Sequence, residues 1–222
     1  MPLPRFHRLP PERREQILAV AQRHFAGQGP ETASYNRIIE AVGFSKTSAY
    51  QYFDGRDDLL AAVLDGVHDR LLAALGPWPG TRDTAEFWDR LEAGSRALVT
   101  HLRLHPDDLA LAGAALAHRG TRRWLGWFTA VVENGQRLGV IRTDTDQDLL
   151  VAVTAAVFRA ADEWALAALG PSAENGPAPD TAVRDTGRQV WSLLHGLWTA
   201  PAPAGRAPAT GHRDPGDGGR AH

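Results

Sequence analysis

The sequence of 222 residues contains no cysteine, which excludes disulfide bonds and metal sites built from thiolates. It also has no apolar run that approaches the roughly 20 residues of a membrane-spanning helix. Residues 1–8 include nothing like the apolar core of a secretory signal peptide. These absences predict a soluble protein that is located in the cytoplasm and does not contact a membrane.

Strand patterns and catalytic motifs are missing as well. Apolar residues do not alternate with polar ones, whereas they recur at helical spacing, as in Ile17, Val20, Ala21 and Phe25. The sequence shows no nucleophile elbow, phosphate loop, paired catalytic carboxylates or zinc signature. We therefore predict an all-α protein without catalytic residues, cofactor or metal site. A helical enzyme is the alternative from a different functional class.

The charge is unevenly distributed along the chain. Residues 1–56 hold 8 of the 24 Lys and Arg but only 5 of the 26 Asp and Glu, which leaves 16 basic and 21 acidic residues in the remainder. A basic N-terminal part followed by an acidic remainder suits a protein that binds a polyanion at one end. Chance fluctuation is the alternative interpretation of so small an excess.

Proline, glycine and capping residues divide the chain into helices. Pro11 suits the first turn of a helix, Gly43 can end one in a left-handed conformation, and Ser45 can cap the next. The first predicted helix runs from Pro10 to the stop signal at 27–30, and the others cover 34–43, 45–53, 56–76, 84–105, 106–118, 121–138, 146–169 and 181–198. The segment 201–222 is rich in proline and glycine, so we expect a disordered tail.

The most informative segment is 41–53, with the sequence AVGFSKTSAYQYF. It predicts a tight turn followed by a short polar helix, which is too short to be stable without neighbours. Lys46 in this helix is the only lysine of the chain. A polar, hydroxyl-rich helix that follows another helix and a turn is typical of the recognition helix of a DNA-binding protein.

The residue types in and around this helix suit contacts with double-stranded DNA. Lys46, Thr47, Ser48 and Gln51 can read base edges, because Lys pairs with guanine, Gln with adenine and the Thr methyl with thymine. Phosphates would be held by tyrosine hydroxyls and by flanking polar side chains. The predicted DNA-binding set is Ser34, Arg37, Ser45, Lys46, Thr47, Ser48, Tyr50, Gln51, Tyr52 and Arg56. As alternatives, either tyrosine packs in the core and Lys46 is merely solvated.

Residues 12–60 resemble the N-terminal domain of the tetracycline-repressor (TetR) family of bacterial regulators. The matching positions are Ile17, Leu18, Ala21, Phe25 and Gly29, then the segments 38–46, 50–53 and 56–60, and residues 135–144 are similar to the turn before that family's dimerisation helix. Thr47, Ala49, Arg56 and the segment 35–37 depart from the family pattern. The resemblance implies a helix-turn-helix DNA-binding domain over 1–56 and a helical effector-binding and dimerisation domain over 57–200.

Tryptophan is abundant, with seven residues, six of them on predicted helices of the C-terminal part. The resemblance implies an effector pocket lined by equivalent helices, and its predicted residues are Trp88, Leu91, Ser95, Trp124, Trp127, Phe128 and Phe158. Core and interface packing is the alternative role of each tryptophan. The effector would be a small apolar or aromatic molecule.

Two further features of the C-terminal part concern partners and metals. The helices that carry Leu150, Val153, Val157, Ala161 and Trp164, then Val183, Val190, Leu194, Leu197 and Trp198, are apolar on more than one side, which favours a homodimer held by a four-helix interface. His101 and His105 have metal-ligand spacing, with Asp107 and Asp108 just beyond. Because no third ligand is identifiable, we expect a polar helix face there.

The sequence thus predicts a ligand-responsive homodimeric repressor that a small effector releases from a palindromic operator. An activator, or a regulator without an effector, is the alternative within the same class. The effector, the operator sequence and the regulated genes have no signature in the sequence.

Overall fold

The computed structural model describes residues 2–118, 121–169 and 179–200. In these ranges the chain forms helices and no strands, as the all-α prediction requires. The helices are α1 Pro4–His7, α2 Pro11–Gln28, α3 Tyr35–Ala41, α4 Lys46–Ala49, α5 Arg56–Leu75, α6 Thr84–Leu104, α7 Pro106–Ala117, α8 Thr121–Arg137, α9 Gln147–Leu169 and α10 Pro179–Trp198. None of the helices in the described ranges is long and apolar enough to cross a membrane.

The short helices at the N-terminal end are positioned by local signals. Gly43 adopts a φ of 80° after α3, as predicted for a left-handed residue that ends a helix. The Ser45 hydroxyl caps α4 by accepting the Ser48 amide at 3.1 Å. Ser34 precedes α3 but makes no side-chain cap. α4 is shorter than the helix predicted over 45–53: it ends at Ala49, and a turn carries the chain to the buried Phe53.

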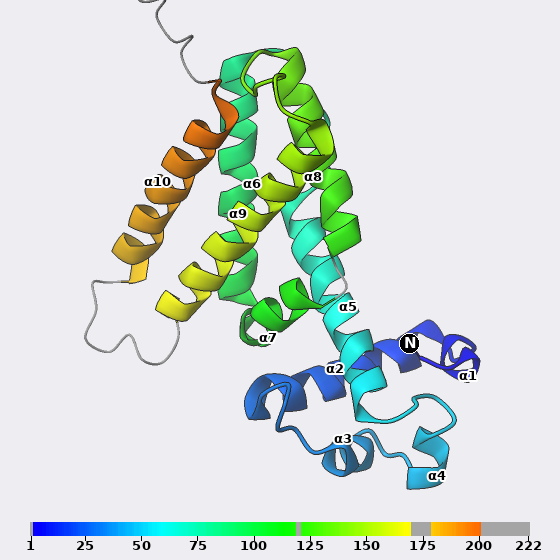
Figure 1. The fold of residues 1–222 in the computed structure, drawn as a ribbon. Coiled ribbons are helices and arrows are strands. Elements are labelled where there is room, and N and C mark those ends of the chain that lie inside the picture. The colour runs from blue at the N-terminus through cyan, green and yellow to red at the C-terminus, as the bar shows by residue number, and fades with distance from the viewer. Residues whose placement is uncertain (1, 119–120, 170–178, 201–222) are drawn as a thin grey trace, which may run out of the picture.

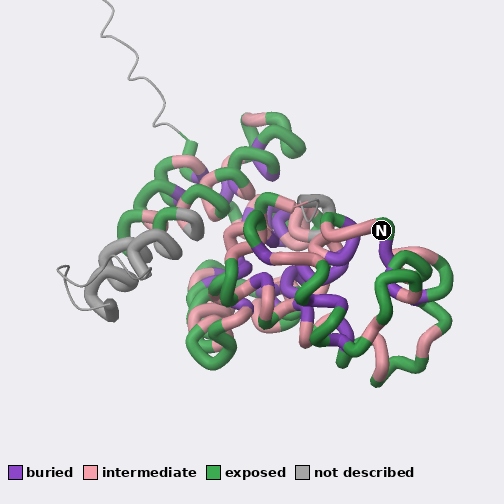
Figure 2. The backbone as a smooth tube through the Cα atoms, turned by 90° about the horizontal axis from the view of Figure 1, so that it is seen from below, coloured by how far each residue is buried: buried purple, intermediate pink, exposed green. Residues whose placement is uncertain are grey.

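α5 connects this N-terminal unit to the rest of the molecule (Figure 1). One core cluster includes Phe25 of α2, Ile38 of α3, Val67 of α5 and Leu111 of α7. Figure 2 shows that buried positions gather inside the molecule and that exposed ones lie towards its outside. Because α2 and α7 pack on the same side chains, the core continues past residue 56, where the sequence analysis placed the domain boundary.

A second core joins α6, α8, α9 and α10 and includes Phe87, Val131, Leu150, Leu194 and Trp198. The Trp198 indole N–H donates to the Thr154 hydroxyl at 3.0 Å, which fixes α10 against α9. The last turn of α8 and the turn that follows it each contain a glycine that the path of the chain requires. A Cβ on Gly135 would lie 2.5 Å from side-chain atoms of Ile141, and Gly139 has a φ of 70°.

α1 was not predicted, although its Phe6 packs on Phe53 with ring centroids 4.8 Å apart. The predicted disordered tail, 201–222, lies outside the described residues.

Candidate functional sites

α4 presents a polar surface at the N-terminal end of the molecule. Its buried side is formed by Ala49, while Lys46 and Thr47 are exposed and Ser48 is partly exposed. The hydroxyls of Ser45 and Ser48 lie 2.9 Å apart and share a hydrogen bond, so both are part of the helix start. Lys46 and Thr47 thus offer the freest side chains of this helix.

Gln51 is exposed just after α4, and its side-chain oxygen accepts a hydrogen bond from Arg5 at 2.6 Å. Arg5 belongs to α1, and the Leu3 amide just before this helix donates to the Tyr52 carbonyl of the same turn at 2.9 Å. Sequence reasoning missed Arg5, because a single arginine 46 residues away carries no spacing signal. The structure adds it to the polar surface around α4.

The two tyrosines of this segment differ in environment. Tyr50 is 60% exposed, whereas Tyr52 is partly buried and stacks on Phe44 with ring centroids 5.1 Å apart. Tyr50 also lies near the ring of Tyr35, at 6.1 Å. Burial, and then the neighbouring Tyr50 and Asp58, raise the pKa of the Tyr35 phenol, so it stays protonated at neutral pH. Tyr50 is therefore more accessible to a partner than Tyr52, whose ring also packs on the core.

The predicted DNA-binding residues on either side of this segment also differ in exposure. Arg37 on α3 is exposed, and Ser34 just before α3 is partly exposed. Arg56 has a side chain only 24% exposed, which donates to the carbonyls of Ala33, at 3.1 Å, and of Pro30 and pairs with Asp57 at 2.8 Å. In the free protein Arg56 fastens the loop before α3 to the start of α5, so a phosphate contact by Arg56 would compete with these bonds.

A cavity of about 240 Å³ lies among α5, α6, α7, α8 and α9. The structure places six of the seven predicted pocket residues on its wall: Leu91, Ser95, Trp124, Trp127, Phe128 and Phe158. Trp88 is not on this wall. It packs instead against Trp191 and Trp198 of α10, with ring centroids 6.1 Å and 5.8 Å away. The cavity wall also includes Arg159, which sequence reasoning missed because a lone arginine on an apolar helix does not reveal its neighbours.

Trp124 connects the cavity to α5. Its ring stacks on the buried His68 with centroids 5.7 Å apart and an interplanar angle of 22°. Its indole N–H is buried and has no acceptor in the described part of the chain. Packing alone therefore holds Trp124 in place, in contrast to Trp127, which donates to the Gly76 carbonyl at 3.0 Å.

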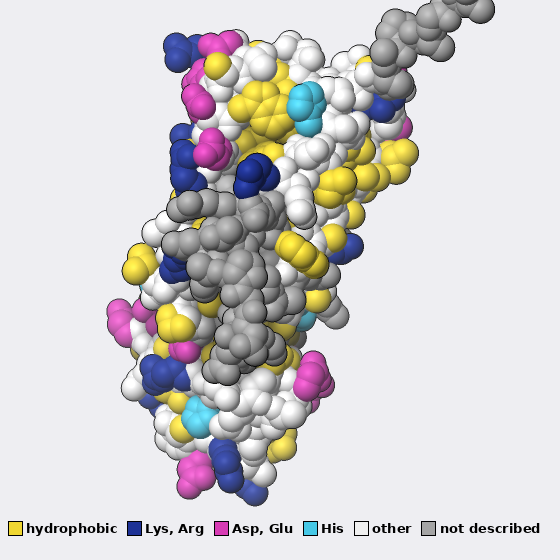
Figure 3. Space-filling model, turned by 90° about the vertical axis from the view of Figure 1, so that its left-hand side faces the viewer, with side chains coloured by type: hydrophobic (Ala, Val, Ile, Leu, Met, Phe, Trp, Pro, Cys, Tyr) yellow, Lys and Arg dark blue, Asp and Glu magenta, His cyan; other side chains and the backbone are white. Residues whose placement is uncertain are grey.

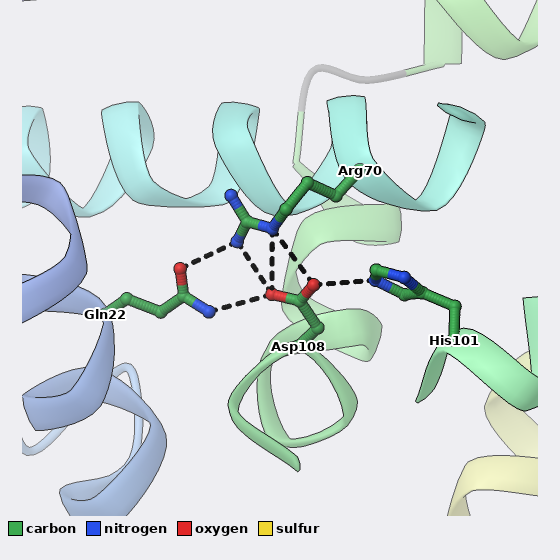
Figure 4. A network of polar contacts seen from close by, with 4 residues as sticks. All are labelled: Gln22, Arg70, His101 and Asp108. Carbon is green, nitrogen blue, oxygen red and sulfur yellow. Dashed lines mark hydrogen bonds and ion pairs between the residues drawn. The ribbon is translucent and has the colours of Figure 1, made fainter. Parts of the chain in front are cut away.

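A network of four polar side chains, Gln22, Arg70, His101 and Asp108, joins α2, α5, α6 and α7 (Figure 4). Asp108 is 1% exposed and accepts from Arg70 at 2.7 Å, from Gln22 at 2.8 Å and from the His101 Nε2 position at 2.8 Å. Burial alone would raise the pKa of the Asp108 carboxyl. The hydrogen bonds from Arg70, His101 and Gln22, together with the Arg70 charge, outweigh burial and hold this pKa below its usual value.

The network accounts for one of the two histidines that have metal-ligand spacing. His101 faces Asp108, and the exposed His105 lies against the His101 ring at 4.3 Å. Within the described ranges no group of three His, Cys, Asp or Glu residues is arranged to hold a metal ion. His101 thus belongs to a packing network between helices.

Comparison with known proteins gives a family match at the N-terminal end. A sequence profile described as "bacterial regulatory proteins, tetR family" matches residues 17–63. An uncharacterized HTH-type transcriptional regulator of Mycobacterium tuberculosis is 33% identical over 101 residues, 44% of this chain and 46% of the relative. The HTH-type transcriptional activator FasR of Mycolicibacterium smegmatis is 35% identical over 94 residues, 42% of each chain. The chain thus spans less than half the length of these curated relatives.

The fold has known counterparts over most of its length. The structure of SmeT, the repressor of the Stenotrophomonas maltophilia multidrug efflux pump SmeDEF, is similar with a TM-score of 0.61 at 18% identity, over 83% of this chain and 89% of SmeT. At this identity the likeness shows the fold: an N-terminal helix-turn-helix unit followed by a helical C-terminal part.

Proposed function

We propose, from the premise that this chain belongs to the tetR family of bacterial regulatory proteins, that it is a cytoplasmic, homodimeric repressor that binds a palindromic operator in double-stranded DNA. The observation that carries the proposal is α4, whose inner face is buried by Ala49 while Lys46 and Thr47 are exposed. A short helix with one buried face and with hydrogen-bond donors and acceptors on its exposed face can enter the major groove of DNA.

The proposal that a ligand controls operator binding rests on the cavity. A ligand that fits only one subunit arrangement shifts the protein towards that arrangement, and operator binding weakens if the recognition helices are then wrongly spaced. FasR is named an activator and SmeT a repressor, so an activator is the second candidate. The cavity of about 240 Å³ beside α5 supports the ligand-responsive form over a regulator without an effector.

The dimer proposal rests on side chains that the monomer leaves uncovered. Leu149 and Trp164 of α9 are 56% and 58% exposed, Val153 is 36% exposed, and Leu193 of α10 is 65% exposed. Figure 3 shows hydrophobic side chains gathered on the face that α10 presents. Four uncovered apolar side chains on two adjacent helices favour burial against a second copy.

The structure changes which residues the dimer proposal uses. Leu150, Leu194 and Trp198 are buried in the core of their own chain and are not available to a partner. Val190, Leu197, Val157 and Ala161 are partly exposed. The side chain of Val183 is not among those that the structure describes.

The first prediction tests base reading. Lys46→Ala and Thr47→Ala should each relax the preference at one operator position and weaken binding there by roughly 1–3 kcal/mol, because each removes contacts to a base edge. Operator sequences selected from random DNA by wild type and variants, followed by mobility shifts, measure this. Arg82→Ala, which removes an exposed arginine of the C-terminal part, is the control. Unaltered base preference in both α4 variants would contradict the assignment.

The second prediction separates Arg37 from Arg56. Arg37→Gln should reduce the slope of log affinity against log salt by about 0.9, because one phosphate contact is lost, and should leave the melting temperature unchanged. Arg56→Gln should lower the melting temperature, because it removes the bonds to Pro30 and Ala33. Salt titrations of operator binding and thermal melts measure both effects. A full salt slope in Arg37→Gln would show that Arg37 does not touch the backbone.

A further inference from the structure

The cavity has one charged side chain on its wall, among the residues that the structure describes. The wall consists of leucine, alanine, phenylalanine and tryptophan side chains, with Ser95 and Arg159 as the exceptions. Arg159 lies on α9, and it both lines the cavity and is exposed to solvent. No hydrogen bond or ion pair of Arg159 is present in the described ranges.

We infer that this cavity binds a compact apolar molecule that carries a single anionic group, with the apolar body inside and the anion on Arg159. The inference rests on the proposed function, because it names the chemical class of the effector. A planar guanidinium offers two parallel N–H donors to a carboxylate, and such charge-assisted bonds are stronger than neutral ones. Ser95 supplies a neutral hydroxyl for a second polar contact.

The electrostatics of the cavity select among ligand classes. A cation of the same shape would meet the like charge of Arg159, and the described residues of the wall include no carboxylate to offset it. A neutral molecule would gain the apolar contacts, but the Arg159 guanidinium would stay hydrated and add nothing to its affinity. An anionic head therefore adds affinity that the aromatic wall alone does not provide.

The size of the cavity limits the ligand. Its volume of about 240 Å³ lies just below the usual range of ligand sites, about 300–1,000 Å³. A short alkyl chain or a single fused aromatic body fits this space, whereas a large planar drug does not. Trp124, Phe128 and Phe158 offer faces on which such a body can pack.

The test uses the full chain and two series of probes that differ only in charge. Octanoate, 1-octanol and octylamine form one series, and 1-naphthoate with 1-naphthylmethanol forms the other. Binding is measured by calorimetry and by quenching of tryptophan fluorescence at pH 7. We expect the anion to bind about tenfold more tightly than the alcohol in at least one series, and octylamine to bind more weakly than octanol.

Two variants assign the preference to its residue. Arg159→Gln should bring the anion to the affinity of the alcohol, while the alcohol itself binds as before. Arg96→Gln is the matched control, because Arg96 is an exposed arginine on α6 that pairs with Glu92 at 2.6 Å and is not on the cavity wall. Equal binding of anion and alcohol in the wild type, or an anion preference that survives Arg159→Gln, would overturn the inference, as would a failure of both anions to bind.

A separate readout distinguishes this inference from the proposed function. Operator binding is followed by mobility shift with and without each probe. If the protein binds DNA sequence-specifically but shows no preference for anions, the proposed ligand class is wrong and the proposed DNA-binding function still stands. If the wild-type protein does not bind DNA sequence-specifically, the proposed function is wrong. Calorimetry still decides whether the cavity prefers an anion.

Discussion

Leu193→Glu is expected to convert the proposed dimer into monomers and to weaken operator binding by about a hundredfold or more. Leu193 is 65% exposed on α10, which packs against α9, the helix that carries the exposed Leu149, Val153 and Trp164. A carboxylate buried there without a partner costs about 3–5 kcal/mol, and about 1.4 kcal/mol corresponds to a tenfold change in affinity. A palindromic operator needs two linked recognition helices, so a monomer loses one half-site.

The measurement is sedimentation at micromolar concentration, together with mobility shifts on the selected operator. Leu104→Glu is the matched control, because Leu104 is 71% exposed but belongs to α6. A wild-type monomer, or a Leu193→Glu protein that remains dimeric, would rule out this interface. Leu194→Glu is unsuitable for the test, because Leu194 is fully buried in its own chain and a charge there would unfold the monomer.

Asp108→Asn is expected to lower the free energy of unfolding at pH 7 by about 3 kcal/mol, the lower end of the range for breaking a buried ion pair. The lower end applies because the Arg70 side chain is 43% exposed and can be hydrated, whereas the Asp108 side chain is 2% exposed. For a chain of this size the loss corresponds to a fall in melting temperature of roughly 6–12 °C. Asp107→Asn, a change in the same first turn of α7 at a partly exposed residue, is the control.

The same substitution has a defined pH dependence. The pKa of Asp108 in the folded state lies below its usual value. Its stabilisation is therefore complete above the pKa of the unfolded chain, about 3.9, and is lost as the pH falls through the lower, folded-state pKa. Denaturant unfolding at fixed protein concentration should show wild type and Asp108→Asn converging as the pH drops below about 4. A difference that is constant from pH 7 to pH 3 would mean that the carboxylate charge is not what the network uses.

The helices were predictable because their signals are local. Pro11, Gly43, Gly76 and Pro106 mark helix ends through their own backbone preferences, and the observed bounds of the longer helices lie close to the predicted ones. α4 is the exception. The predicted helix continued to residue 53, but the chain turns after Ala49 so that Phe53 reaches the core beside Phe6. That contact depends on α1, which no local pattern indicated.

The candidate sites were predictable only in part. The family resemblance indicated which helices surround a cavity, and most of the predicted residues lie on its wall. Trp88 does not lie on this wall, because it turns to α10, where it packs on Trp191 and Trp198. Arg159 and Arg5 were missed, because each gains its role from residues far along the chain.

The sequence by itself determined the helical class and the short polar helix that Ser45 begins, since each depends on residues within a few turns of one another, and it carried the resemblance of the N-terminal segment to the tetR family. The tertiary structure alone decided which face of each apolar helix is covered. It buried Leu194 and left Leu193 exposed, although both are leucines on one helix. Neighbouring residues on a helix point about 100° apart, and only the packing of α10 against α9 determines which of the two lies inside.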